Sequence, residues 1–214
     1  GNFVIMNVPE SHPIAILNNG NTNISYALKN ASEPIVINVS GGNETADSFG
    51  DYYNFTDASN NTIHIANGSF KFMRGQSYKF QGDNISSSHP FNIYMNGEFL
   101  PSWEFTIPSD HSTNSGDIYY QCHFHENMKG NLSLLYKEVS NSTADGGYDF
   151  YYGDVEVTVN GDFGNTSVYC FHHGYMGGEN LLQFSGLYIH SDNLDNISFF
   201  CNPINIISNV ETIY

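Results

Sequence analysis

The sequence predicts an all-β protein, and three features lead to that prediction. Short runs of alternating or continuous apolar residues, such as Phe91–Met95 and Ile118–Gln121, recur along the chain. Clusters of Gly, Asn, Asp and Ser bound these runs, and helical periodicity is nearly absent. Many short strands separated by turn residues are typical of β-sandwiches and β-barrels.

The candidate strands run from the N-terminal residues to the C-terminal tail. With 214 residues, the chain can form one large domain or two of about 100 residues each, and either can bury a core without disulfides. In chain order the candidates are Phe3–Val8, Ile14–Leu17, Ile35–Val39, Thr62–Ile65, Ser77–Phe80, Phe91–Met95, Trp103–Ile107, Ile118–Gln121, Leu132–Tyr136, Val155–Val159, Ser167–Cys170, Leu181–Phe184, Ile197–Phe200 and Ile204–Ile207.

The charge balance argues against two classes of partner. Lys and Arg total 6 against 22 Asp and Glu, for a formal net charge of -16. Such a chain cannot neutralise a phosphate backbone, so we expect no nucleic-acid partner, and the charge also disfavours binding to an anionic membrane surface. No apolar run approaches the roughly 20 residues of a membrane span. The first residues lack the regions of a signal peptide, so we expect that any such peptide has been removed.

The strongest compositional signal is the pattern Asn-x-Ser/Thr, which marks acceptors of N-linked glycans. With 28 Asn and 33 Ser and Thr, a random order gives about four such patterns, whereas the chain has twelve. Asn-rich turns that happen to contain Ser and Thr are the alternative explanation. The excess favours a secreted, extracellular glycoprotein. The acceptors are Asn23, Asn30, Asn38, Asn43, Asn54, Asn60, Asn67, Asn84, Asn131, Asn141, Asn165 and Asn196.

One loop in the middle of the chain carries a soft set of metal ligands. Its Cys122, His125 and Met128 have the spacing Cys-x2-His-x2-Met, and His89 supplies a second imidazole upstream. A thiolate, two imidazoles and a thioether match the ligands of a copper electron-transfer site. We expect Gly130, just after the loop, to let the backbone turn sharply into the next strand.

The same pattern occurs a second time. Cys170, His173 and Met176 repeat the spacing, and the early stretch ESHPIAILNNG matches SSHPFNIYMNG, which contains His89, at its Ser-His-Pro and Asn-Gly positions. His12 is therefore the counterpart of His89, and the chain holds two copies of one unit. One copy is contiguous, and the other is split around it.

The contiguous copy resembles the cupredoxin, or blue copper, family over residues 60–137. The resemblance rests on the upstream His after a polar turn, on the loop YYQCHFHENMKG and on the strand NLSLLY that follows. It implies two Greek-key β-sandwich domains, each with a trigonal copper site and a weak axial Met. The ligand sets that it implies are His89, Cys122, His125 and Met128 in the contiguous copy, and His12, Cys170, His173 and Met176 in the split copy.

Alternatives to copper remain open at both sites. A disulfide is permitted in a secreted protein, but it does not explain His and Met at the same offsets twice. Zinc would need a fourth ligand of its preferred kind, and none is evident.

Three cysteines cannot all pair within one chain. If both groups hold copper, Cys201 is a buried thiol or forms a disulfide with another chain. If Cys201 instead forms a disulfide with Cys170, the second group is not a copper site.

The residues do not indicate an enzyme. Multicopper oxidases need several His-x-His pairs, and the pair here, His123 and His125, already gives one member to the mononuclear site. No catalytic triad, phosphate loop or pair of carboxylates stands out. The histidines expected outside the copper sites, at the surface or in turns, are His64, His111, His123, His172 and His190.

Two linker-like stretches, 41–50 and 140–147, predict the domain limits. We expect the first part of the split domain at 1–40, the complete domain at 51–138, a linker at 139–147, the second part of the split domain at 148–186 and C-terminal strands at 187–214.

A split domain can be completed in two ways. Residues 1–40 can fold back onto residues 148–186, or they can complete a neighbouring copy and give a head-to-tail homopolymer. Apolar strands at both ends of the chain favour self-association, because secreted proteins normally cover such edges. We therefore expect an extracellular structural subunit of a fibre or coat, with one or two copper ions. The alternative is a soluble electron carrier or copper-storage protein, although glycans at Asn84 and Asn131 would obstruct docking.

Overall fold

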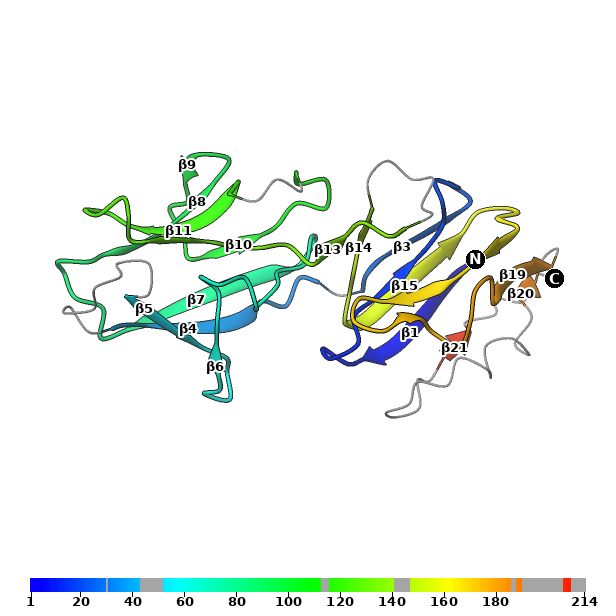
Figure 1. Ribbon diagram of the computed structural model, residues 1–214, viewed down its shortest axis with the longest axis horizontal. Coiled ribbons are helices and arrows are strands. Elements are labelled where there is room, and N and C mark those ends of the chain that lie inside the picture. The colour runs from blue at the N-terminus through cyan, green and yellow to red at the C-terminus, as the bar shows by residue number, and fades with distance from the viewer. Residues whose placement is uncertain are drawn as a thin grey trace. The chain divides into compact units, whose positions relative to one another are not determined.

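The computed structural model describes residues 1–29, 31–42, 52–112, 116–140, 147–185, 188–189 and 206–208. Every regular element in these ranges is a β-strand, which confirms the all-β prediction (Figure 1). Among the described residues, no helix is present that is long and apolar enough to span a membrane.

The chain divides into two compact units, and one of them is discontinuous in sequence. As far as their residues are described, unit 1 consists of Gly1–Asn30 together with Tyr136–Tyr214, and unit 2 consists of Ala31–Leu135. The whole of unit 2 is therefore inserted between the two segments of unit 1.

Unit 2 contains two sheets. The described strands are β4 (Ile35–Gly41), β5 (Tyr53–Thr56), β6 (Thr62–Ile63), β7 (Ser77–Asp83), β8 (Phe91–Met95), β9 (Glu98–Phe99), β10 (Glu104–Thr106), β11 (Ile118–Cys122) and β12 (Lys129–Asn131). One sheet has the order β10-β7-β4-β5-β6 and the other the order β12-β11-β8-β9. Strands β4 and β7 are parallel, and the other pairs are antiparallel.

An aromatic core lies between the two sheets of unit 2. Phe55 on β5 and Tyr120 on β11 come from different sheets, and their ring centroids are 5.0 Å apart. Cys122 and Met128 belong to the same buried cluster. The sulfur atoms of the predicted copper site are therefore part of the interior, where dense packing limits their movement.

Unit 1 is closed by pairing between its two segments. Its described strands are β1 (Asn2–Val8), β2 (Ile14–Ile16), β3 (Ile24–Leu28), β13 (Tyr136–Lys137), β14 (Tyr148–Asp149), β15 (Gly153–Val159), β16 (Asn165–Thr166), β17 (Val168–Cys170), β18 (Gly174–Tyr175), β19 (Leu182–Ser185), β20 (Tyr188–Ile189) and β21 (Ile206–Ser208). The sheets have the orders β21-β1-β15-β3, β18-β17-β2, β16-β19-β20 and β13-β14. Strands β1 and β3 pair with β15, and β2 pairs with β17, so unit 1 is completed within one chain.

The limits of the units differ from the expected domains around β4. This strand falls within the expected range 1–40 of the split domain, but it pairs with β5 and β7 of unit 2. Its Ile37 and Val39 lie in the core of unit 2. The first segment of unit 1 thus ends at residue 30, and the second begins at Tyr136 rather than at residue 148.

One candidate strand does not form as expected. Within Leu132–Tyr136, Leu134 makes an isolated bridge to Phe72, and only Tyr136 begins a strand, β13. Other expectations lie outside the described residues. These are the run 197–200, residues 141–146 of the linker, Cys201, His190, the region 187–214 apart from β20 and β21, and the acceptors Asn30, Asn43, Asn141 and Asn196.

Candidate metal centres

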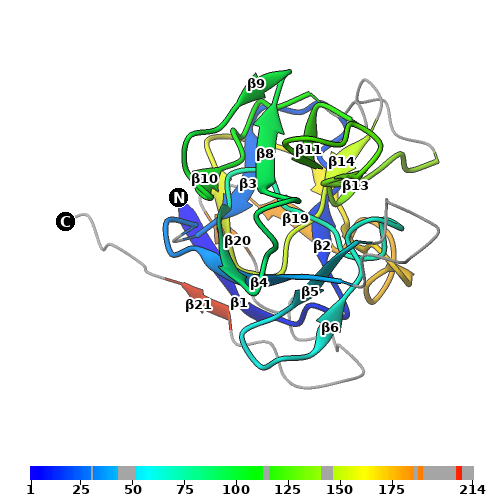
Figure 2. The same ribbon diagram turned by 90° about the vertical axis from the view of Figure 1, so that its left-hand side faces the viewer.

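In unit 2, the pairing of β8 with β11 brings His89 and Cys122 together (Figure 1, Figure 2). Cys122 lies opposite Phe91, so His89 stands just beyond the end of the paired strands. The backbone N–H of Cys122 donates to the Met128 carbonyl at 2.9 Å, and the N–H of Met128 donates to the His125 carbonyl at 3.0 Å. These two bonds fold the loop so that His125 returns to the thiol.

Three of the four predicted ligands of this centre, His89, Cys122 and His125, are close to one another. The Nδ1 atoms of His89 and His125 are 3.2 Å apart. The Sγ atom of Cys122 lies 3.9 Å from the first nitrogen and 3.4 Å from the second. Cys122 is fully buried and forms no disulfide, while His89 is half-buried.

Unit 1 builds a second centre from its two sequence segments. Strand β2 pairs with β17 so that Cys170 lies opposite Ile14, and His12 stands beyond the end of that pair. The Nδ1 atoms of His12 and His173 are 3.0 Å apart. The Sγ atom of Cys170 lies 3.8 Å from the first and 3.4 Å from the second. Cys170 is also buried and free of disulfides.

The two centres share details of backbone geometry that the sequence match does not require. In each, the residue after the Cys donates its backbone N–H to the Pro that follows the upstream His. The N–H of His123 donates to the Pro90 carbonyl at 2.9 Å, and that of Phe171 donates to the Pro13 carbonyl at 2.8 Å. Both Asn-Gly dipeptides of the repeat have positive φ at both residues. The two centres are therefore copies of one structure.

The ligand atoms of each centre fit a single metal ion. An ion about 2.0 Å from each nitrogen and about 2.3 Å from the sulfur, in one plane, requires separations of about 3.5 Å between nitrogens and 3.7 Å from nitrogen to sulfur. The observed separations are 3.0–3.2 Å and 3.4–3.9 Å, within a few tenths of those values. Each His-Cys-His group could therefore hold one ion.

The two methionines of the motif are shielded from solvent. Met128 is fully buried, and Met176 is 9 % exposed. A thioether in such a place is kept from water and from oxidation, and it is available only to neighbours in the core.

Gly130 is required for a reason other than the expected one. Its backbone is not among the left-handed positions, so the chain does not need glycine there for a sharp turn. A Cβ atom at Gly130 would lie 2.5–2.7 Å from the hydroxyl and ring of the buried Tyr120, which lies opposite it across the β11–β12 pair. Glycine therefore permits the close approach of β12 to β11.

Groups beside the unit 2 centre hold its upstream His in place. The hydroxyl of Tyr53 lies 2.9 Å from the His89 carbonyl and 3.2 Å from the Pro90 carbonyl, and it donates to this pair. The ring of Tyr52 lies 4.5 Å from that of His89. Burial raises the pKa of Tyr53 well above its usual range, and the adjacent Cys122 raises it further. No sequence pattern indicated these roles of Tyr52 and Tyr53.

The unit 1 centre has a cation as its neighbour. The half-buried Lys137 donates to the carbonyl of Phe171, the residue after Cys170, at 2.7 Å. Its ammonium also lies 5.4 Å from the Phe171 ring centroid and 5.7 Å from that of Tyr169. Burial lowers the pKa of the nearby His172, and the charges of the surrounding histidines and lysine lower it further. No sequence pattern indicated Lys137.

The remaining histidines lie outside the two centres. His123 and His172 are exposed and take no part in the ligand groups, in agreement with the prediction. His111 lies in a turn, where its backbone N–H donates to the Pro108 carbonyl at 3.1 Å, but it is not at the surface: it is only 6 % exposed, and its Nε2 atom has no hydrogen-bond partner. Ile107, four residues before it, lies in the core of unit 2.

The described asparagines of the acceptor patterns differ in how free their side-chain amides are, because the Nδ2 atoms of Asn23 and Asn38 donate to the backbone carbonyls of Asp162 and Asp57. None of them is buried; Asn23 and Asn38 are half-buried, and the exposed ones are Asn54, Asn60, Asn67, Asn84, Asn131 and Asn165.

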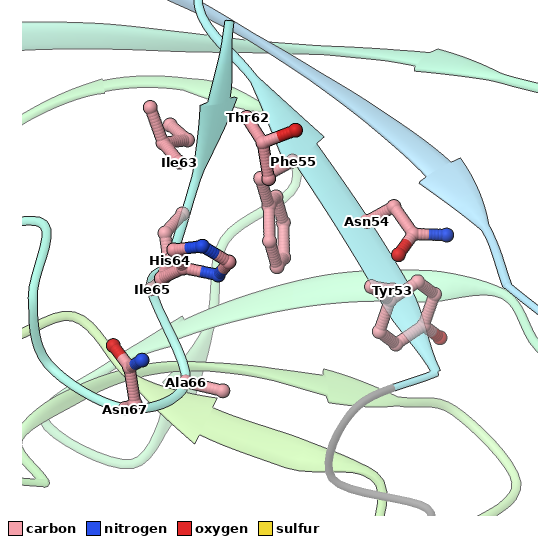
Figure 3. A pocket seen from close by; sticks show the side chains of 9 residues that line it. All are labelled: Tyr53, Asn54, Phe55, Thr62, Ile63, His64, Ile65, Ala66 and Asn67. Carbon is pink, nitrogen blue, oxygen red and sulfur yellow. The ribbon is translucent and has the colours of Figure 1, made fainter. Parts of the chain in front are cut away.

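A pocket of ≈ 430 Å³ opens beside β5 and β6 in unit 2 (Figure 3). Tyr53 and Phe55 from β5 and His64 line it, together with the acceptors Asn54 and Asn67.

Comparisons with family models, with curated proteins and with solved structures found no match. The assignment of function therefore rests on the residues and geometry of the two centres.

Proposed function

We propose that the chain is an extracellular copper-binding protein with two mononuclear sites of one type. The observation that supports this most strongly is the repeated ligand group, two imidazole nitrogens and one cysteine sulfur within 3.9 Å of one another in each unit. Residues selected only for packing have no reason to recur in the same backbone geometry, with exposed or half-buried histidines over a buried thiol.

The ligand types favour copper over other metals. Thiolate and thioether ligands suit Cu(I), and two His with one Cys and a weak axial Met are typical of blue-copper sites. The proposed ligands are His89, Cys122 and His125 in unit 2, and His12, Cys170 and His173 in unit 1, with Met128 and Met176 as axial ligands. Bound copper would supply one-electron transfer, and the strands around each thiol would limit rearrangement between oxidation states. The all-β fold is in keeping with cupredoxin-type domains.

The extracellular setting is part of the same proposal. Acceptor asparagines that are not buried occur on both units, which suits a secreted glycoprotein. Secreted proteins commonly form disulfides, and the burial of Cys122 and Cys170 would keep these free thiols away from oxidants. N-linked glycans would also keep the protein surface hydrated, because the chain has few lysines and arginines.

Assembly into a fibre or surface coat is the second candidate function. The observation that favours it is the split of unit 1, because the pairs β1–β15 and β2–β17 join distant segments and the same pairs can form between two copies. Pairing within one chain already covers these edges, so exchange is not needed to satisfy them. Negative-stain electron microscopy of concentrated native protein distinguishes the cases: filaments support assembly, and discrete monomers alone contradict it.

Spectroscopy tests the copper proposal. Copper(II) added to the metal-free protein should give an intense visible band from thiolate-to-copper charge transfer. Cys122→Ser and Cys170→Ser should each remove part of the band, and zinc should suppress it only at a large excess. A correctly folded protein that gives no band, or a band that survives both substitutions together, would overturn the proposal.

A further inference from the structure

The outer face of one sheet in unit 2 carries a row of aromatic side chains. Phe99 on β9, Tyr94 on β8 and Tyr119 on β11 follow one another across the sheet. The rings of Tyr94 and Tyr119 are stacked with centroids 5.0 Å apart and an interplanar angle of 10°, and Phe99 meets Tyr94 edge-on at 6.0 Å. We call these three residues the aromatic row.

This row faces away from the core. Along β11, Ile118, Tyr120 and Cys122 are buried, whereas Tyr119 lies on the opposite face and is only half-buried. Phe99 is 53 % exposed. An exposed strip of large aromatic side chains is unfavourable in water unless something covers it.

The acceptor Asn131 lies at one end of the aromatic row. It is directly opposite Tyr119 in the β11–β12 pair. Gly130 points inward to Tyr120, so Asn131 and Lys129 project on the same face as Tyr119. Directly opposed residues on antiparallel strands have Cβ atoms about 4.5–5.5 Å apart, so a group attached to Asn131 begins beside the Tyr119 ring.

One face of the Tyr119 ring is directed toward β12. Tyr94, on β8, stacks from the other side, and the exposed Lys129 of β12 reaches over the ring at 5.4 Å from its centroid. A long, solvated lysine side chain is easily displaced from such a position, because it loses rotamer freedom when held there.

We propose that the first sugars of a glycan on Asn131 pack against Tyr119 and extend along the aromatic row. The inference rests on the proposed N-glycosylation, and it is independent of metal binding. A pyranose ring has one face made of C–H groups, which can cover an aromatic face and remove apolar area from water. The covalent link holds the sugar at a high effective concentration beside the ring. The glycan then covers a surface that would otherwise be an aggregation hazard on unit 2.

The other acceptors supply a matched comparison. Asn60 is exposed in the turn between β5 and β6, where its backbone N–H donates to Asp57, and no aromatic ring contact involves that turn among the described residues. A glycan there should be solvated and should add little to the stability of unit 2.

The experiment is a double-mutant cycle on protein from an N-glycosylating host. Ser133→Ala removes the acceptor pattern without changing Asn131, and Tyr119→Thr removes the ring while keeping a residue favoured in strands. Ser133→Ala should lower the melting temperature of unit 2 by roughly 4–8 °C in the wild-type background. Ser133→Ala should lower the melting temperature far less in the Tyr119→Thr background. The control Thr62→Ala, which removes the Asn60 acceptor pattern, should have no such effect.

Nuclear magnetic resonance gives a direct readout that does not depend on stability. Protons of the first sugar on Asn131 should be shifted upfield by the Tyr119 ring, and the shift should vanish in Tyr119→Thr. Peptide mapping shows which of the two claims fails, the glycosylation or the packing of the glycan. Protein without glycans at any acceptor overturns the glycosylation on which the inference rests. Glycans at Asn131 with no ring shift and an additive cycle overturn the packing, while copper binding is unaffected in either case.

Discussion

Replacement of Gly130 by Ala should damage the unit 2 centre through its backbone. The new Cβ would lie 2.5–2.7 Å from three atoms of Tyr120, well inside normal contact distance. Tyr120 is fully buried and ringed by aromatic neighbours, so it cannot move aside, and overpacking of this kind costs about 1–3 kcal/mol. Strand β12 must then retreat from β11.

That retreat also pulls on the loop that carries the ligands. The Met128 carbonyl accepts a hydrogen bond from the backbone N–H of Cys122, so movement of the loop weakens this bond. Loss of a hydrogen-bond partner of a metal ligand typically lowers the metal affinity by about 10–100-fold. Hydrogen exchange of β8 and β11 amides should show the lower free energy of unfolding, and copper titration should show weaker binding in unit 2 only. The loss should shrink in a Tyr120→Leu background, which removes the clashing atoms. Unchanged stability, or equal weakening of both centres, would refute this reasoning.

Three other predictions concern side chains elsewhere in the two units. Tyr53→Phe should cost about 1–2 kcal/mol in denaturant unfolding, because the His89 carbonyl loses its buried donor; no change would show that water replaces the hydroxyl. Burial raises the pKa of Tyr26 and of Tyr152, so the unfolded state loses these protons first and stability should fall above pH 10, by up to about 1.4 kcal/mol per pH unit for each tyrosine. Unfolding across that range, with the Phe variants as controls, checks this. Lys137→Met should shift the unit 1 site toward Cu(II) by about tenfold, or 59 mV in its potential, because a nearby cation disfavours the more positive oxidation state. An unchanged potential in a Cys122→Ser background would contradict it.

The sequence was sufficient to predict that each unit brings two histidines and one cysteine together in a group that could hold a metal ion, including the distant His12. Its Ser-His-Pro context and Asn-Gly turn matched those of His89, and the strand registers turned out to correspond residue for residue. Repetition made this possible, because one contiguous copy served as a guide to the split copy. In each unit the upstream histidine lies close to the cysteine, as expected.

Other features depend on contacts that no local pattern encodes. Strand β4 has an apolar run that suits either unit, and only its pairing with β5 and β7 assigns it to unit 2. The run Leu132–Tyr136 looks like a strand, but its backbone bonds are divided between Ile118 and Phe72. The role of Gly130 depends on Tyr120 across the strand pair, so conformational preference alone gave the wrong reason.

The copper content of purified protein tests the central claim, that the two centres are separate copies of one metal site. The protein should be loaded with copper, dialysed against a weak chelator and analysed for metal. The account predicts two ions per chain for the wild type, one for Cys122→Ser, one for Cys170→Ser and none for the double variant. A wild-type chain that retains no copper, or single variants that retain as much as the wild type, would contradict it.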